Sequence, residues 1–88
     1  MRKAIRFTAN WCNPCKQYAP KWDAVASKRD DWEFIVIDVD TDMEKANEYG
    51  IRNIPATVLV NDGDILFKQT GIIEISDLEN KLDEHLQD

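Results

Sequence analysis

Apolar and polar positions alternate near the start of the chain and then change to a helical spacing. Residues 3–9 alternate well enough to predict a strand. From Pro14 to about Arg29 the spacing predicts a helix whose apolar face is formed by Tyr18, Trp22, Val25 and Ala26. Pro14 falls at an early helical position, where its missing N–H costs nothing. Pro20 lies within the pattern and predicts a kink.

The middle of the chain predicts a second strand and a short helix. Residues 33–40 contain the continuous apolar run Phe34-Ile35-Val36-Ile37. Such a run favours a central strand that is covered on both faces. Thr41 and Glu44 have the spacing of a capping box, and Gly50 follows as a C-cap. A helix over about 42–49 is therefore expected between these signals.

The last third of the chain predicts a hairpin followed by a helix. Asp62-Gly63 is a strong turn signal between the apolar segments 57–60 and 65–67. Ser76 and Glu79 form another capping box before an apolar stripe of Leu78, Leu82 and Leu86.

These elements give the order β-α-β-α-β-β-α. The two helical crossovers imply parallel pairing of the early strands, and the hairpin adds an antiparallel edge. We therefore expect an α/β fold with a mixed four-stranded sheet, three helices and cover on both faces.

Composition narrows the class of protein. With 88 residues, the chain is expected to form a single domain over 1–88. Its formal charge of −6 argues against nucleic acid or an anionic membrane as the main partner. The sequence shows no apolar run near the roughly 18 residues of a membrane span, and Met1-Arg2-Lys3 does not lead into a signal peptide. A cytoplasmic monomer is the expectation.

The cysteines carry the candidate chemistry. Cys12 and Cys15 are the only two, and His85 is the only histidine, so a four-ligand zinc site is not expected. A bridge closing so short a loop would stabilise the fold little, which favours a redox pair over a structural disulfide. A cluster of acidic residues is formed by Asp38, Asp40 and Asp42. It lacks the spacing of a calcium-binding loop, and a strand end followed by a helix cap explains it better.

A helix start accounts for redox chemistry at this spacing. One helical turn brings two Cα atoms within disulfide range, so the pair can open and close without large backbone movement. Unpaired N–H groups and the helix dipole favour thiolate at this end. Cys12, nearer the tip, is the expected nucleophile, and Cys15 is expected to attack Cys12 and release the reduced substrate.

At this point the sequence resembles the thioredoxin family. The resemblance covers nearly the whole chain from about residue 4 and is carried by several stretches: residues 7–16 around Trp11-Cys12-Asn13-Pro14-Cys15, Ala19-Pro20, Val39-Asp40, residues 49–57 with Ile54-Pro55, Asp62-Gly63 and Gly71. It implies a thioredoxin-like fold. It also implies a cis peptide bond before Pro55 and an apolar substrate groove formed by Trp11, Ile54, Pro55 and Gly71.

Three departures from the family concern length and tuning. The family's usual first strand and helix are missing. Asn13 stands where glycine is usual, and it and Pro14 lie between the cysteines, where residues tune the redox potential. Arg6 stands where the family carries a buried aspartate, and Val36 replaces its lysine partner. Three roles for Arg6 are open: favouring thiolate at Cys15, pairing with Asp38, or extending to solvent from a strand end.

The resemblance implies a protein-disulfide reductase that binds no cofactor of its own. Its electrons would come from NADPH through a flavoprotein, thioredoxin reductase, and ribonucleotide reductase is a plausible disulfide substrate. One alternative is a glutaredoxin-like enzyme recharged by glutathione, which the short length fits but the Cys-Asn-Pro-Cys segment fits less well. Another is a non-catalytic thioredoxin-like binding module, and a zinc-bridged dimer is a remote fourth.

Overall fold

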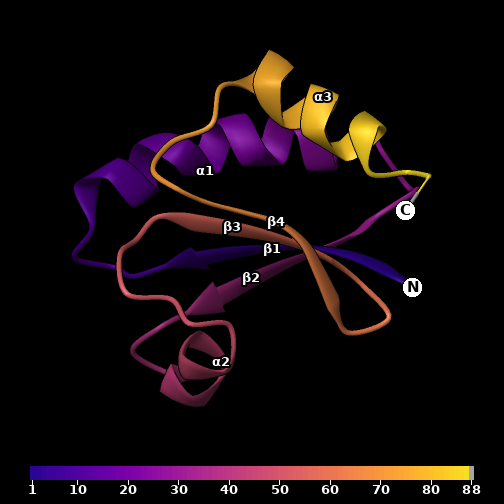
Figure 1. Ribbon diagram of the computed structural model, residues 1–88. Coiled ribbons are helices and arrows are strands. Elements are labelled where there is room, and N and C mark those ends of the chain that lie inside the picture. Colours follow the sequence, from indigo (N-terminus) through magenta and orange to yellow (C-terminus); the bar gives the residue numbers. More distant parts are fainter. Residues whose placement is uncertain (88) are drawn as a thin grey trace.

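The computed structural model describes residues 1–87 as one sheet with helices on both faces (Figure 1). The elements follow in the expected order: β1 (Arg2–Thr8), α1 (Asn13–Ala26), β2 (Glu33–Asp38), α2 (Met43–Glu48), β3 (Ala56–Asn61), β4 (Asp64–Thr70) and α3 (Ile75–Glu84). The predicted fold class is thus confirmed.

The four strands lie in the order β2-β1-β3-β4. β1 is parallel to β2 and antiparallel to β3, and β3 is antiparallel to β4. The expectation that residues 33–40 form a central strand is wrong, because β2 pairs only with β1 and is an edge strand of the described sheet. Its apolar run reflects cover on the two faces, and cover says nothing of how many neighbours a strand has. That cover is incomplete, since Val36 is 50% exposed.

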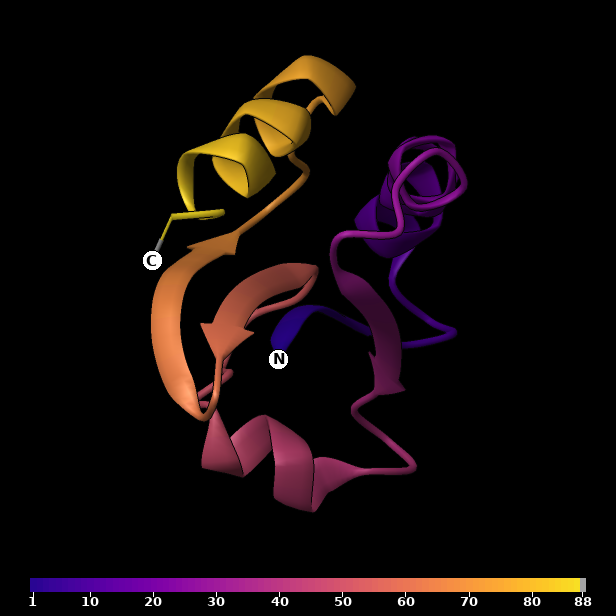
Figure 2. The ribbon, with the colours of Figure 1, turned by 90° about the vertical axis from the view of Figure 1, so that its right-hand side faces the viewer.

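Two apolar clusters lie on opposite faces of the sheet. α1 and α3 lie together over one face, and α2 lies under the other (Figure 2). The first cluster joins the α1 and α3 stripes to β1 and β3 and includes Tyr18, Trp22, Val25, Leu59, Leu78 and Leu82. The second joins the other faces of β1 and β3 to α2 and includes Ile5, Phe7, Ala46, Val58 and Val60. The predicted apolar faces of the first and last helices are confirmed.

The first helix is shorter than expected. α1 ends at Ala26 rather than near Arg29, because the next amides bond in tighter turns, as Lys28 N does to Val25 O at 3.1 Å. The helix continues across Pro20, whose side chain is exposed.

The second helix is capped by a different residue from the one expected. The side chain of Asp42 accepts a hydrogen bond from Lys45 N at 3.1 Å, whereas the Thr41 hydroxyl donates to Asp38 O. The Thr41–Glu44 capping box is therefore wrong by one residue. Gly50 ends the helix as predicted, with φ of 68° and the paired bonds of a Schellman motif, Gly50 N to Asn47 O and Ile51 N to Ala46 O.

The C-terminal signals were also partly right. Asp62 and Gly63 have positive φ values of 52° and 90° and form the predicted two-residue hairpin turn. The Ser76–Glu79 capping box is wrong, because α3 already begins at Ile75 with Glu74 as its N-cap and without a side-chain capping bond.

Candidate active site

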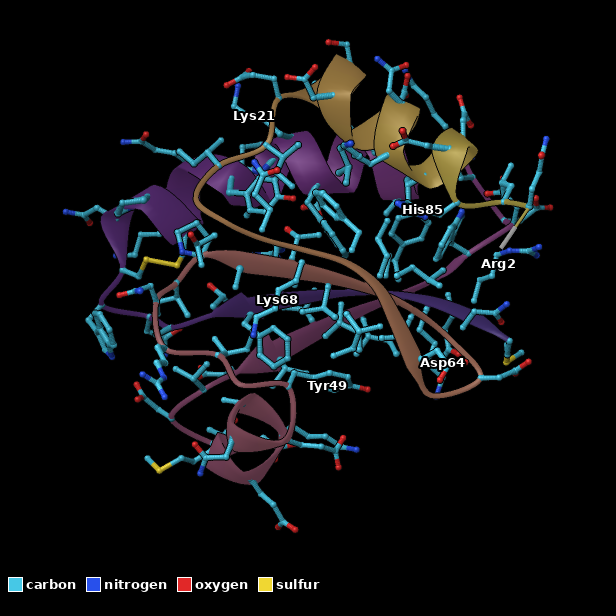
Figure 3. The ribbon with its side chains drawn as sticks, in the orientation of Figure 1. Arg2, Lys21, Tyr49, Asp64, Lys68 and His85 are labelled. Atoms are coloured by element: carbon cyan, nitrogen blue, oxygen red, sulfur yellow. A yellow bond between two sulfur atoms is a disulfide. The ribbon has the colours of Figure 1, made fainter. Side chains whose placement is uncertain are left out.

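The two cysteines lie where the loop after β1 enters α1. They form a disulfide with a Cα–Cα distance of 5.2 Å, visible as the yellow bond in Figure 3. Cys12 is the N-cap residue, and its Sγ accepts a hydrogen bond from Cys15 N at 3.2 Å. Pro14 lies in the first turn, as predicted, where a missing N–H is no loss. The helix thus presents its free N–H end to the sulfur of Cys12.

The sulfurs are shielded on most sides by apolar groups. Cys12 is 5% exposed and Cys15 is 1% exposed, and both pack with Ala9, Val39 and Ile54. Cys12 is thus the more accessible of the two. A disulfide at a helix N-terminus, with one sulfur nearer solvent, has the arrangement needed for thiol–disulfide exchange.

One further loop meets the cysteines, and a second loop is hydrogen-bonded to it. The Ile54–Pro55 peptide bond is cis, which confirms that expectation, and Pro55 is buried. Gly71 follows β4 with φ of 94°, and its N–H donates to Pro55 O at 2.7 Å. The structure therefore joins the Gly71 loop to the proline loop, and Ile54 of that loop lies against the cysteines.

Trp11 lies at the surface beside the disulfide. Its side chain is 67% exposed, and its indole Nε1 donates to Asp40 Oδ2 at 2.8 Å. It borders a shallow groove whose other walls come from α2 and the loops around it, including Val39, Met43, Ala46, Ile51 and Ile54. Trp22 and Trp32, in contrast, are buried in the core, as the apolar stripe of the first helix predicted for Trp22.

Arg6 lies inside the molecule, on the α1 face of β1. It is only 6% exposed, and its guanidinium carbon lies 5.8 Å from the centre of the Trp22 ring. Within residues 1–87 its buried Nε has no hydrogen-bond partner. Burial lowers the pKa of Arg6, and the negative charge of Asp23 on α1 partly opposes this effect.

Two of the three roles considered for Arg6 are therefore wrong. It does not extend to solvent, because α1 and Trp22 cover it. It forms no ion pair with Asp38 in the described chain; Asp38 Oδ1 accepts a bond from Asp40 N at 2.8 Å instead. Val36 lies directly opposite Arg6 on β2, as the resemblance to the thioredoxin family implied for the two positions.

A buried polar pair near the cysteines was missed. The hydroxyls of Tyr18 and Thr57 lie 2.7 Å apart, and both residues are fully buried. Burial raises the pKa of Tyr18, although the bond to Thr57 opposes the shift. The helical spacing predicted Tyr18 only as part of an apolar stripe. The threonine within the apolar run of β3 was the available signal.

Residues 1–87 contain neither a metal-binding cluster nor a membrane-spanning helix. No group of three or more histidine, cysteine, aspartate or glutamate side chains gathers there as a metal site. No helix in that range has both the length and the apolar character that crossing a membrane requires.

Similarity to known proteins extends over nearly the whole chain. The thioredoxin family profile matches residues 2–84. A thioredoxin from Mycoplasmoides gallisepticum is 40% identical over 78 residues, which cover 89% of this chain and 78% of that protein. A thioredoxin from Bacillus subtilis is 32% identical over 81 residues, with 91% and 78% covered. The X-ray structure of Fasciola hepatica thioredoxin superposes with a TM-score of 0.88 at 31% identity, covering 96% of this chain and 80% of that one.

Proposed function

Since the chain belongs to the thioredoxin family and is a protein-disulfide reductase with a redox-active Cys12–Cys15 pair, we propose that Cys12 is the attacking sulfur and Cys15 the resolving one. The observation that supports this order is the helix start. Cys12 is the N-cap residue, it accepts the Cys15 N–H, and it is the more exposed of the two sulfurs. A thiolate there is stabilised by the helix dipole and reached by a substrate.

The proposed cycle begins with the reduced pair. The Cys12 thiolate attacks one sulfur of a substrate disulfide, a bond forms between the two sulfurs, and the substrate's other sulfur leaves as a thiolate and takes a proton. Cys15 then loses its proton and attacks Cys12 Sγ. The Cys12–Cys15 bond forms, the mixed disulfide breaks, and the second substrate sulfur leaves. Two electrons have passed from the cysteine pair to the substrate.

The substrate is proposed to bind across Trp11, Ile54, Pro55 and Gly71. Trp11 supplies an exposed ring on one side of Cys12, and Ile54 supplies apolar contact beneath it. The Pro55 and Gly71 loops are joined by a backbone hydrogen bond and can support an extended substrate segment. Asn13 and Pro14, both exposed between the sulfurs, are proposed to tune the redox potential.

Two cysteine variants test the order of attack. In Cys15→Ser, Cys12 should still attack a protein disulfide, but the mixed disulfide should persist and be isolated as a covalent complex by non-reducing electrophoresis. Cys12→Ser, the matched control, should form no complex. Trapping by Cys12→Ser and not by Cys15→Ser would reverse the assignment. Both variants should lose turnover in an insulin-reduction assay.

The proposed electron source is NADPH through a flavoprotein thioredoxin reductase, and a ribonucleotide reductase is a candidate among the disulfide proteins reduced. We also propose that the protein is a monomer and acts in the cytoplasm. Parallel assays with NADPH and thioredoxin reductase, and with NADPH, glutathione and glutathione reductase, test the source. Rapid turnover only with the glutathione system would replace this proposal by the glutaredoxin-like one.

A further inference from the structure

The proline loop, defined as residues 51–55, carries two of the residues proposed to bind substrate. It follows α2 and leads into β3 without regular secondary structure of its own. Ile54 packs with both cysteines, and Pro55 immediately precedes β3. The path of this short loop therefore decides where its apolar surface lies beside Cys12.

The sheet holds the far end of the proline loop through backbone bonds. Gly71, which follows β4, donates its N–H to Pro55 O at 2.7 Å. Beyond Pro55 the chain enters β3, which pairs with β1 on one side and with β4 on the other. Strands on both sides of β3 thus fix the far end.

A side chain of β4 reaches the near end of the same loop. Lys68 Nζ donates to Tyr49 O at 2.8 Å and to Gly50 O at 3.0 Å (Figure 3). A Cβ atom on Gly50 would lie 3.1 Å from this nitrogen, so the ammonium packs closely on the backbone there. A cation at the end of a helix is favourable because it satisfies free carbonyls and opposes the negative end of the helix dipole.

The near end has weaker support without Lys68. Gly50 N and Ile51 N bond to carbonyls of α2, a helix of only six residues, and a helix that short is not stable by itself in water. Tyr49 and Ile51 also pack against the second apolar cluster, but apolar contact has no preferred direction. The Lys68 bonds join this turn to the sheet and fix the direction of two carbonyls.

We propose that Lys68 is a positioning residue for the reduction of protein disulfides. By holding the Tyr49 and Gly50 carbonyls, it fixes the near end of the proline loop and so keeps Ile54 in place beside Cys12. The inference rests on the proposed function, in which a protein substrate lies across the proline loop. Lys68 acts through the backbone that it holds and is not a catalytic residue.

This role predicts a difference between large and small substrates. An extended protein segment binds to the loop as well as to the sulfur, and a loop that is already ordered loses less conformational entropy when the segment binds. A small disulfide needs only the sulfur of Cys12. Loss of Lys68 should therefore slow the reaction with a protein disulfide and leave the reaction with a small disulfide unchanged.

The first experiment compares these two reactions in single turnover. The reduced protein, freed of dithiothreitol, is mixed with insulin or with hydroxyethyl disulfide, and acid quenching with thiol labelling gives each second-order rate constant. Lys68→Met should lower the insulin constant about two- to tenfold, in keeping with the net contribution of an ordinary hydrogen bond, and leave the other constant unchanged. Lys68→Arg, which keeps a cationic donor, should restore most of the loss. Lys28→Met removes an exposed cation at the far end of α1 and is the control.

The second experiment locates the effect by amide hydrogen exchange in the disulfide form. The Ile51 N–H bonds to α2 and reports on the near end of the loop, whereas Leu59 lies buried in β3. Lys68→Met should accelerate exchange at Ile51 and not at Leu59, because only the near end opens more often. Equal acceleration at both amides would mean a general loss of stability and would overturn the inference.

Three kinetic results would also overturn it: an unchanged insulin constant in Lys68→Met, an equal loss with both disulfides, or an equal loss in Lys28→Met. If Lys68→Met does not fold, Lys68→Gln is measured in its place, and the same results decide. The wild-type reaction with hydroxyethyl disulfide tests the sulfur chemistry alone. Its failure would count against the proposed function, whereas failure of this inference would leave that reaction intact.

Discussion

At the scale of single residues, buried polar atoms behave differently depending on whether they have a partner. The Tyr18 and Thr57 hydroxyls satisfy each other at 2.7 Å inside an apolar cluster, whereas Nε of Arg6, which lies opposite Thr57 in the sheet, has no partner in the described chain. The net gain from a satisfied pair is modest, but leaving one member alone costs about 1–3 kcal/mol.

This asymmetry predicts a double-mutant cycle. Tyr18→Phe and Thr57→Val should each destabilise the fold by about 1–2 kcal/mol, because each strands the other hydroxyl. The double variant should lose clearly less than the sum of the two, since no hydroxyl then remains unpaired. Urea unfolding followed by tryptophan fluorescence measures all three. Additive losses would mean that the hydrogen bond is not formed in solution.

The sequence predicts a residue-scale feature only when the residues that form it lie close together along the chain. The cysteine pair was predictable because its chemistry needs only a three-residue spacing and a helix start. The Tyr18–Thr57 bond joins residues 39 apart, and its partner choice depends on how α1 crosses the sheet. The burial of Arg6 likewise depends on Trp22 of α1 closing over β1, which no local pattern encodes.

At the scale of elements, the apolar pattern together with the turn and capping signals located every helix and strand, but it did not give their exact ends. A capping box requires the helix to begin at one particular residue, and a shift of one position gives the cap to a neighbour, as at Asp42. Strand order was harder still. Cover by helices makes a strand apolar whether it lies at the centre or, like β2, at the edge.

The cap of α2 provides an element-scale prediction. Asp42→Ala should lower the free energy of unfolding by about 1 kcal/mol, because it leaves the Lys45 amide without its acceptor. Thr41→Ala, the control one residue earlier, should cost less than half as much. Chemical denaturation measures the difference, and amide exchange at Lys45 should accelerate only in Asp42→Ala. A larger loss in Thr41→Ala would instead support the capping box.

At the scale of the whole molecule, a few side chains join elements far apart in sequence. Arg29, after α1, bonds to Asp31 before β2 and to Asp83 on α3, with Nη2–O distances of 2.8 Å. Lys21 on α1 reaches Glu74 at the start of α3, and Lys68 on β4 donates to the carbonyls of Tyr49 and Gly50 after α2 (Figure 3). The Arg29 and Lys21 contacts tie α1 to α3, and the Lys68 contacts tie the segment after α2 to the sheet.

The Arg29–Asp31 pair predicts a pH dependence. The Arg29 guanidinium lowers the pKa of Asp31, so the ionised carboxylate stabilises the fold above the unfolded pKa near ~3.9. This contribution is lost as pH falls below about 4, through the lower pKa of the folded state. Because Asp31 is partly exposed, Asp31→Asn should cost only about 0.2–1 kcal/mol at pH 7.

Unfolding in urea at pH 7 and again at pH 3 tests this expectation. The loss caused by Asp31→Asn should shrink at pH 3, where the wild-type carboxyl is largely protonated in the unfolded chain. Asp30→Asn, which removes the same charge one residue earlier without breaking this ion pair, is the control. A loss of equal size at both pH values would show that the pair contributes through packing alone.

The edge position of β2 also bears on how concentrated solutions of the protein behave. An open edge of this kind is a template for cross-β growth between molecules. Two copies meeting in antiparallel register would set Glu33 against Asp38 at both ends of the strand, and each chain carries a formal charge of −6. Repulsion between these like charges thus opposes edge-to-edge association through β2, the strand on which apolar Val36 is half exposed. Its protection weakens as added salt shortens the Debye length.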